Sequence, residues 1–252
     1  MKKIFYIFLL FLGVTLFSEA ATRGDVKVIE ASENIRYLSQ KIVKDYLFFY
    51  KNQNRLEVKH GLSRALSKMT DDFRIIATTT KDGDTKDILE FLAYSKDQIE
   101  QIFNEKSNKE QAALMLDYSE TLLEGADSIA LAHKYDFSEE ERMLMLTKKI
   151  EYLLERVTKY YMAINVGFNT PTNKEQMKDT MIRIEESLVE ISLYNYPEEM
   201  KELQSSINES WRINSVFLYK SGTLFIPKLM FISIEFLENS ISKLALYHSK
   251  NQ

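Results

Sequence analysis

One stretch of this chain of 252 residues occurs twice: NIRYLSQKIVK at residues 34–44 and KIEYLLERVTK at residues 149–159. The copies are 115 residues apart, and the same offset continues downstream without a gap. It pairs identical residues far from the opening match, such as Met115 with Met230 and His133 with His248. Because one offset aligns a turn, a helix start and a helix end together, the sequence predicts an internal duplication.

The repeated stretch lies in a segment with helical periodicity. Apolar residues recur three or four positions apart at Ile35, Leu38, Ile42, Tyr46 and Phe49, which places them on one face of a helix. Similar patterns cover approximately residues 55–79, 85–105 and 109–134. The chain contains only 7 glycines and 3 prolines, too few for a fold of many short strands and tight turns.

Helix boundaries are also visible. Around Gly83 we expect a turn with positive φ, and Thr85 is expected to cap the next helix. Ser138 followed by Glu141 predicts a capping box, in which each residue satisfies a backbone N–H of the other. Pro171 predicts a helix that starts beside it.

These patterns predict an all-α protein made of two tandem up-down four-helix bundle units of about 115 residues each. The units span residues 21–135 and 136–252, after a signal peptide. We expect them to meet end to end through the short break at residues 135–138.

Residues 1–20 are typical of an export signal. Two lysines precede 14 apolar residues, and small residues at Ser18 and Ala20 predict cleavage after Ala20. The alternative is an uncleaved anchor, but 14 helical residues reach only about 21 Å of a hydrocarbon core of about 30 Å. We therefore expect a periplasmic protein. It has no cysteine, which excludes disulfides, thiolate metal sites and lipidation through cysteine.

Charge and motifs exclude several function classes. The formal net charge is −4, which gives no electrostatic reason to expect nucleic-acid binding. No phosphate loop, dinucleotide fingerprint or nucleophile elbow occurs, so we expect no enzyme, no cofactor and no metal. His133 and His248 are expected to cover bundle ends as cations near helix C-termini. A metal or proton site is the alternative for them.

The repeated stretch resembles a known family signature. NIRYLSQKIVK at residues 34–44 is similar to the motif GRQRMLSQRIAK of PilJ-like domains, the N-terminal domains of type IV pilus methyl-accepting chemotaxis transducers. These are related to the sensor domains of NarX-type nitrate sensors. The stretch FIPKLMFIS at residues 225–233 also resembles the closing helix of the family. The resemblance covers approximately residues 26–249 and implies a helical, periplasmic, often duplicated sensor domain.

The resemblance implies a site. In the nitrate-sensor branch the motif arginine binds a small anion near a dimer axis, and Arg36 matches that position. A guanidinium offers paired donors to a planar oxyanion. Gln40 lies one turn further on the same face, and Lys41 matches the second basic position but points away from Arg36. The alternative is that Arg36 is ion-paired or solvated. Glu151 occupies the position of Arg36 in the second copy, so no anion site is expected there.

We therefore expect a non-enzymatic sensor-type module that binds a small ligand, such as an anion, or a partner protein in the periplasm or inner membrane. A homodimer is one arrangement that the resemblance leaves open. The alternative is a helical scaffold of the cell envelope without a ligand pocket.

Overall fold

The computed structural model describes residues 23–51, 56–221 and 224–252, and within these ranges the protein consists of eight helices without strands. The prediction of an all-α fold is confirmed, whereas the predicted signal peptide lies outside the described residues. No helix in the described ranges is long and apolar enough to span a bilayer. The helices are α2 (Arg23–Lys51), α3 (Leu56–Thr79), α4 (Gly83–Asn104), α5 (Lys109–Ala132), α6 (Glu139–Asn165), α7 (Pro171–Leu193), α8 (Glu198–Tyr219) and α9 (Pro227–Lys250).

The 115-residue offset recurs in the helix boundaries. Helices α3 and α7 start 115 residues apart, and so do α4 and α8. Helix α9 starts three residues later than this offset predicts from α5, with Pro227 as its first residue. Its buried positions still keep the offset, because Met115 and Met230 are both in the core.

Side-chain caps account for several helix starts. Glu141 accepts a hydrogen bond of 2.8 Å from the backbone N–H of Ser138, and the Ser138 hydroxyl accepts one of 3.3 Å from the N–H of Glu141, so the predicted capping box is confirmed. The expectation at Gly83 is wrong. Gly83 is the first residue of α4, and Asp82 caps the helix by accepting 2.7 Å from the N–H of Thr85. A carboxylate before a helix satisfies a free N–H there, so no turn with positive φ is needed.

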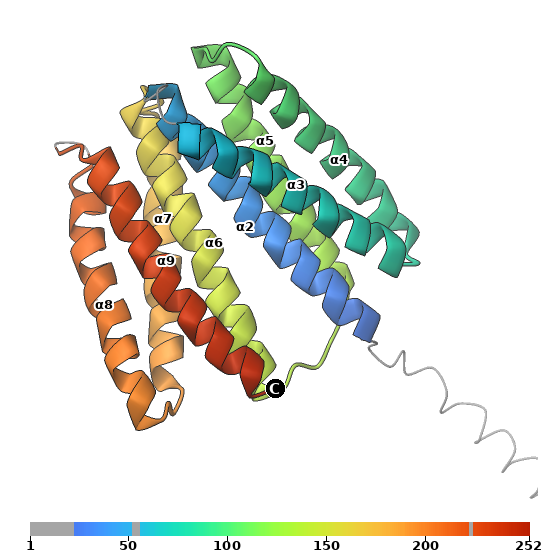
Figure 1. Cartoon of the computed structure of the whole chain (residues 1–252), viewed down its shortest axis with the longest axis vertical. Helices are drawn as coiled ribbons and strands as arrows, with labels where there is room; N and C mark the ends of the chain where they lie inside the picture. The colour runs from blue at the N-terminus through green and yellow to red at the C-terminus, as the bar shows by residue number, and fades with distance from the viewer. Residues whose placement is uncertain (1–22, 52–55, 222–223) are drawn as a thin grey trace, which may run out of the picture.

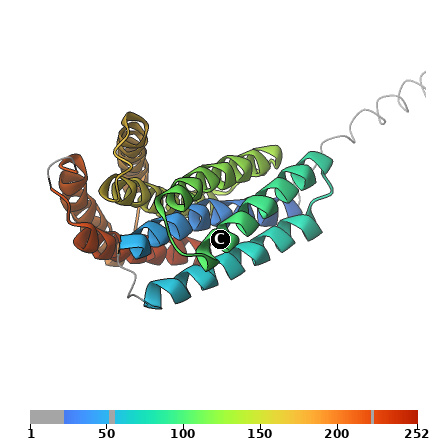
Figure 2. The same ribbon diagram turned by 90° about the horizontal axis from the view of Figure 1, so that it is seen from above.

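Helices α2 and α6 form the centre of the molecule and pack against each other side by side. Helix α2 also contacts α3 and α5, while α6 contacts α7 and α9 in the same way. Helix α4 packs mainly on α5, and α8 mainly on α9. Figure 1 shows α3 to α5 on the α2 side of this central pair and α7 to α9 on the α6 side, and the view from above agrees (Figure 2). The expected end-to-end arrangement is therefore wrong.

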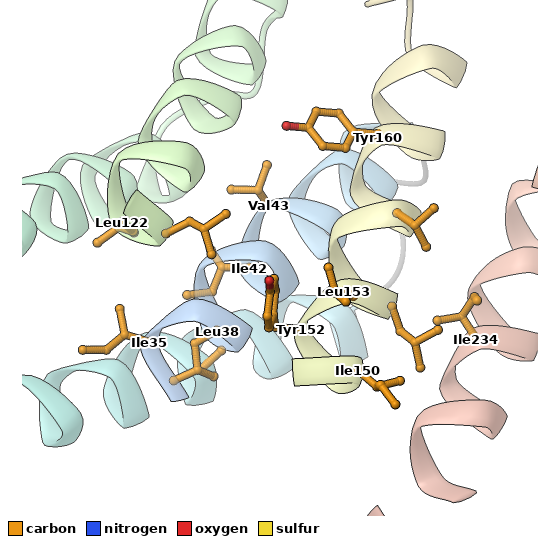
Figure 3. Packing of buried hydrophobic residues seen from close by; sticks show 14 of the residues in the cluster. Ile35, Leu38, Ile42, Val43, Leu122, Ile150, Tyr152, Leu153, Tyr160 and Ile234 are labelled. Carbon is orange, nitrogen blue, oxygen red and sulfur yellow. The ribbon is translucent and has the colours of Figure 1, made fainter. Parts of the chain in front are cut away.

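A shared apolar core follows this central contact. Ile35 and Ile42 of α2 and Leu153 of α6 have no exposed surface. In Figure 3 Tyr152 of α6 projects toward α2 among these residues. Because α2 and α6 are each covered on several sides, their polar side chains are also buried and must find partners inside the protein.

Candidate functional site

Arg36 is nearly buried and faces carboxylates. Its Nη1 lies 2.5 Å from Glu33 Oε1, and its Nε lies 2.6 Å from Asp127 Oδ1. Its guanidinium carbon stands 4.2 Å from the centre of the Tyr152 ring, a stacked cation–π contact. Burial alone would lower the pKa of Arg36, but Glu33 and its other neighbours raise it above the usual value. The donors that the resemblance assigned to an anion are thus directed at carboxylates of the same chain.

Gln40 and Lys41 have separate partners. The Gln40 amide has no exposed surface and donates 3.1 Å to the carbonyl of Ser119 in α5. Lys41 instead donates 3.1 Å to Glu155 in α6. Arg36, Gln40 and Lys41 therefore end on three different groups, and the structure does not gather them around one ligand.

A buried charge network joins α2, α6 and α9. Lys44 is almost fully buried and lies 2.7 Å from Glu155 and 3.5 Å from Asp45. Burial raises the pKa of Glu155, but Lys44 and Lys41 lower it to about 2. Burial and the Glu155 carboxylate both raise the pKa of Glu238 well above its usual value. The network therefore holds Glu155 as an anion and favours a protonated Glu238.

A related network lies 115 residues on. Lys159, the counterpart of Lys44, is completely buried and forms ion pairs and hydrogen bonds with Glu120 and Ser119 of α5. Arg156 lies 2.6 Å from the same Glu120. Since two cations share one carboxylate, burial dominates and lowers the pKa of Lys159 to about 8.

A polar cavity of about 270 Å³ opens beside the first network. It lies between the central helices α2 and α6 and is bordered by α3 and α9. Its lining is almost entirely polar and consists of Glu33, Asn34, Tyr37, Lys68, Lys148, Glu151, Glu238 and Ser242.

Two carboxylate oxygens in this lining have no hydrogen-bond partner among the described residues: Oε2 of Glu33 and Oε1 of Glu238. Both residues are more than nine-tenths buried. The third carboxylate, Glu151, accepts 2.6 Å from the hydroxyl of Ser242. Burial raises the pKa of each of the three. Buried acceptors normally have donors, so the cavity is suited to a molecule that supplies them.

Other candidate sites have structural partners. His133 Nδ1 lies 2.8 Å from Asp25, and His248 Nδ1 lies 2.6 Å from Glu140. Each histidine thus ties the end of one helix to the start of another. Within the described ranges, no group of three or more metal-ligating side chains of the His, Cys, Asp and Glu types comes together.

Comparison of the chain with protein-family models, with curated proteins and with solved structures gives no match. The cavity is therefore assigned from its own residues. Sequence reasoning missed it, although one signal was present: the repeat pairs Arg36 with Glu151, a reversal of charge on otherwise similar helices. That reversal excluded an anion site in the second copy. It could equally have indicated a site there that prefers a positively charged group.

Proposed function

We propose that this protein is a non-enzymatic ligand-recognition module, exported to the periplasm and built from two copies of one four-helix unit. The matching helix starts of α3 with α7 and α4 with α8 support the duplication. So do the two histidine pairs, because Asp25 and Glu140 are related by the same offset as His133 and His248. Export rests on the signal pattern of residues 1–20.

The ligand of this module binds in the polar cavity between α2, α3, α6 and α9. One observation carries this assignment: Glu33 and Glu238 bring buried carboxylate oxygens without hydrogen-bond partners in the described structure to the wall of one cavity. An unsatisfied buried acceptor costs about 1–3 kcal/mol, so a ligand that donates to it gains binding energy. This favours ligand binding over a purely structural role for the cavity.

The position of the cavity also suits signalling. Its walls come from both central helices, through Tyr37 of α2 and Glu151 of α6 among others. A ligand that contacts both walls stabilises the arrangement of α2 and α6 in which those contacts form. A partner protein in the periplasm or inner membrane that binds the same arrangement would then respond to the ligand.

A thermal-unfolding screen of the purified protein against small polar metabolites tests this function. A ligand present at about 100 times its Kd adds about 2.7 kcal/mol to the free energy of unfolding. We expect at least one compound to raise the Tm of the parent, with a much smaller shift in Tyr37→Leu. A screen in which every shift is equal in parent and Tyr37→Leu contradicts the assignment of the site.

A second candidate function is a scaffold of the cell envelope. Leu229, Ile232 and Phe236 of α9 are more than half exposed and lie three and four residues apart on one side of the helix. Exposed apolar stripes of this kind are typical of protein contacts. Under this hypothesis Phe236→Ser abolishes complex formation in the envelope, while ligand shifts in the thermal screen stay as in the parent.

A further inference from the structure

We propose that the cavity binds a small organic cation, a guanidinium or primary ammonium group, which stacks on Tyr37 and donates to the carboxyl oxygens of Glu151, Glu33 and Glu238. This inference rests on the proposed function and adds the chemical class of the ligand.

The 115-residue offset maps the cavity onto a second place in the protein. Tyr37 maps onto Tyr152, Glu151 onto Arg36, Ser242 onto Asp127 and Lys68 onto Arg183. These four counterparts are in contact: Arg36 stacks on Tyr152 and pairs with Asp127, and Arg183 donates 2.7 Å to the Tyr152 hydroxyl. The place that corresponds to the cavity is thus filled by the guanidinium of Arg36.

The residue differences between the two halves explain why the chain itself fills the place at Tyr152 and leaves the cavity beside Tyr37. Arginine at position 36 is long enough to cross from α2 to Tyr152 of α6. Its counterpart Glu151 is shorter and acidic, and it is held by Ser242 at the edge of the cavity. The chain therefore places the Arg36 guanidinium 4.2 Å from the centre of the Tyr152 ring. Over Tyr37 the chain's own cation, Lys41, stays 5.9 Å from the ring centre and pairs with Glu155.

The remaining lining matches a cation. In the filled half, Arg36 pairs with Glu33 and Asp127. In the cavity, Ser242 stands at the position of Asp127, so the carboxyl group of that position is missing. Glu238 stands at the position of the apolar Leu123 and adds a carboxyl group instead. Three carboxyl groups thus face two lysines, and one of these, Lys148, donates 3.3 Å to the side-chain oxygen of Asn34. The cavity therefore presents carboxyl oxygens, two of them without hydrogen-bond partners among the described residues, and such acceptors bind the N–H donors of a cation better than the oxygens of an anion.

The size of the cavity limits the ligand. A volume of about 270 Å³ is slightly below the range of about 300–1,000 Å³ that is typical of pockets for drug-sized molecules. It therefore suits a guanidinium or ammonium group on a short tail. Methylguanidinium and ethylammonium are suitable probes, because each carries the proposed cation and little else.

Calorimetric titration of the purified protein with these two probes tests the proposal. We expect saturable binding to the parent and an affinity at least roughly tenfold lower in Glu151→Gln and in Tyr37→Leu. Glu235→Gln is the matched control, since this glutamate is exposed on α9 outside the cavity. It should bind as the parent does. Equal affinity in parent, Glu151→Gln and Tyr37→Leu overturns the proposal.

Glu151→Arg gives an independent test that does not depend on loss of a contact. The new side chain should fill the cavity over Tyr37 as Arg36 covers Tyr152. We expect a folded protein with a Tm at or above that of the parent and no binding of either probe. If Glu151→Arg folds and still binds methylguanidinium with the parent affinity, the cation does not occupy this cavity and the proposal is wrong.

The same titrations separate this inference from the proposed function. Glycine and nitrate serve as a zwitterionic and an anionic probe. If either binds with a dependence on Tyr37 while both cations fail to bind, the cavity remains a ligand site but the cation assignment is overturned. If no probe or metabolite shows a dependence on Tyr37, both proposals are contradicted.

Discussion

Two lysines at the same position of the repeat differ in their electrostatics. Lys44 and Lys159 are both buried and lie 115 residues apart. Burial would lower the pKa of each, but Lys44 lies near Glu155 and Asp45, which raise its pKa above the usual value. Lys159 shares Glu120 with Arg156, so its pKa falls to about 8. In a buried site, the number of carboxylates per cation therefore decides whether the pKa of a lysine rises or falls.

This difference predicts a pH effect on stability. Lys159 has a pKa of about 8 in the folded protein and an ordinary value of 10.5 in the unfolded chain, so between these values the unfolded chain binds more protons. The free energy of unfolding therefore rises with pH across this window, by up to about 3 kcal/mol from this group. Denaturant unfolding at a series of pH values should show that rise in the parent and not in Lys159→Met. A rise of equal size in both proteins would assign it to other groups.

The same pair predicts unequal costs of neutralisation. Lys44→Met leaves two buried carboxylates, Glu155 and Asp45, with Lys41 as the remaining lysine of the network, which should cost about 3–5 kcal/mol. Lys159→Met leaves Glu120 paired with Arg156 and removes a charge that burial disfavours, so its cost should stay within about 1 kcal/mol. Urea unfolding of the two variants at neutral pH measures both values. Equal costs would show that the two networks are electrostatically alike.

At this scale the sequence predicts some contacts and misses others. Glu33 precedes Arg36 by three residues, a helical spacing at which opposite charges meet, so the ion-paired alternative for Arg36 could be foreseen. Its stacking on Tyr152 could not, because this contact joins two helices that are more than 100 residues apart. The cavity depends on such contacts alone, and local patterns therefore did not indicate it.

At the scale of the helices, each histidine pair connects the end of one helix to the start of another. The Glu140 carboxylate at the start of α6 is bound by His248 in the last turn of α9 and by the hydroxyl of Tyr194. Burial raises the pKa of Glu140, but these hydrogen bonds lower it below its usual value of 4.5. Its stabilising contribution is therefore present above this pH and is lost as the pH falls below it.

We expect Glu140→Gln to lower stability at neutral pH and to reduce the loss of stability on acidification below pH ~4.5. Hydrogen exchange should become faster at the start of α6 and the end of α9, because the tie between them is weakened. Glu139→Gln is the matched control, since Glu139 is exposed on the first turn of the same helix. If the control changes exchange at these ends as much as Glu140→Gln does, the tie with His248 is not the cause.

Helix positions were largely predictable because their signals are local. The apolar period of α2 and the capping box at Ser138 each lie within a few residues of sequence, and both are confirmed. At Gly83 the wrong residue was held responsible for the helix boundary. Asp82 caps α4 through its carboxylate, whereas the prediction relied on a positive φ at the glycine. The side-by-side contact of α2 and α6 was missed, because a short connection does not determine how two helical units pack.

In the whole molecule, the contact between α2 and α6 should make all helices unfold together. One apolar core includes residues from both sides of this contact, so neither side can lose its packing without exposing the other. The only tryptophan, Trp211, lies in α8 and is buried. Its fluorescence therefore reports on the second half, while far-ultraviolet circular dichroism reports on all helices.

Ile76 of α3 and Ile191 of α7 form a matched pair for testing this cooperativity, because they are related by the repeat and are both buried. Replacing either by alanine should cost about 2–5 kcal/mol. If the halves unfold together, Ile76→Ala in the first half lowers the urea midpoint of Trp211 fluorescence as much as Ile191→Ala does, and both probes give one transition. A Trp211 midpoint that moves only with Ile191→Ala would mean that the halves unfold independently. A ligand in the cavity would then have to couple the two halves, because the walls of the cavity belong to both halves.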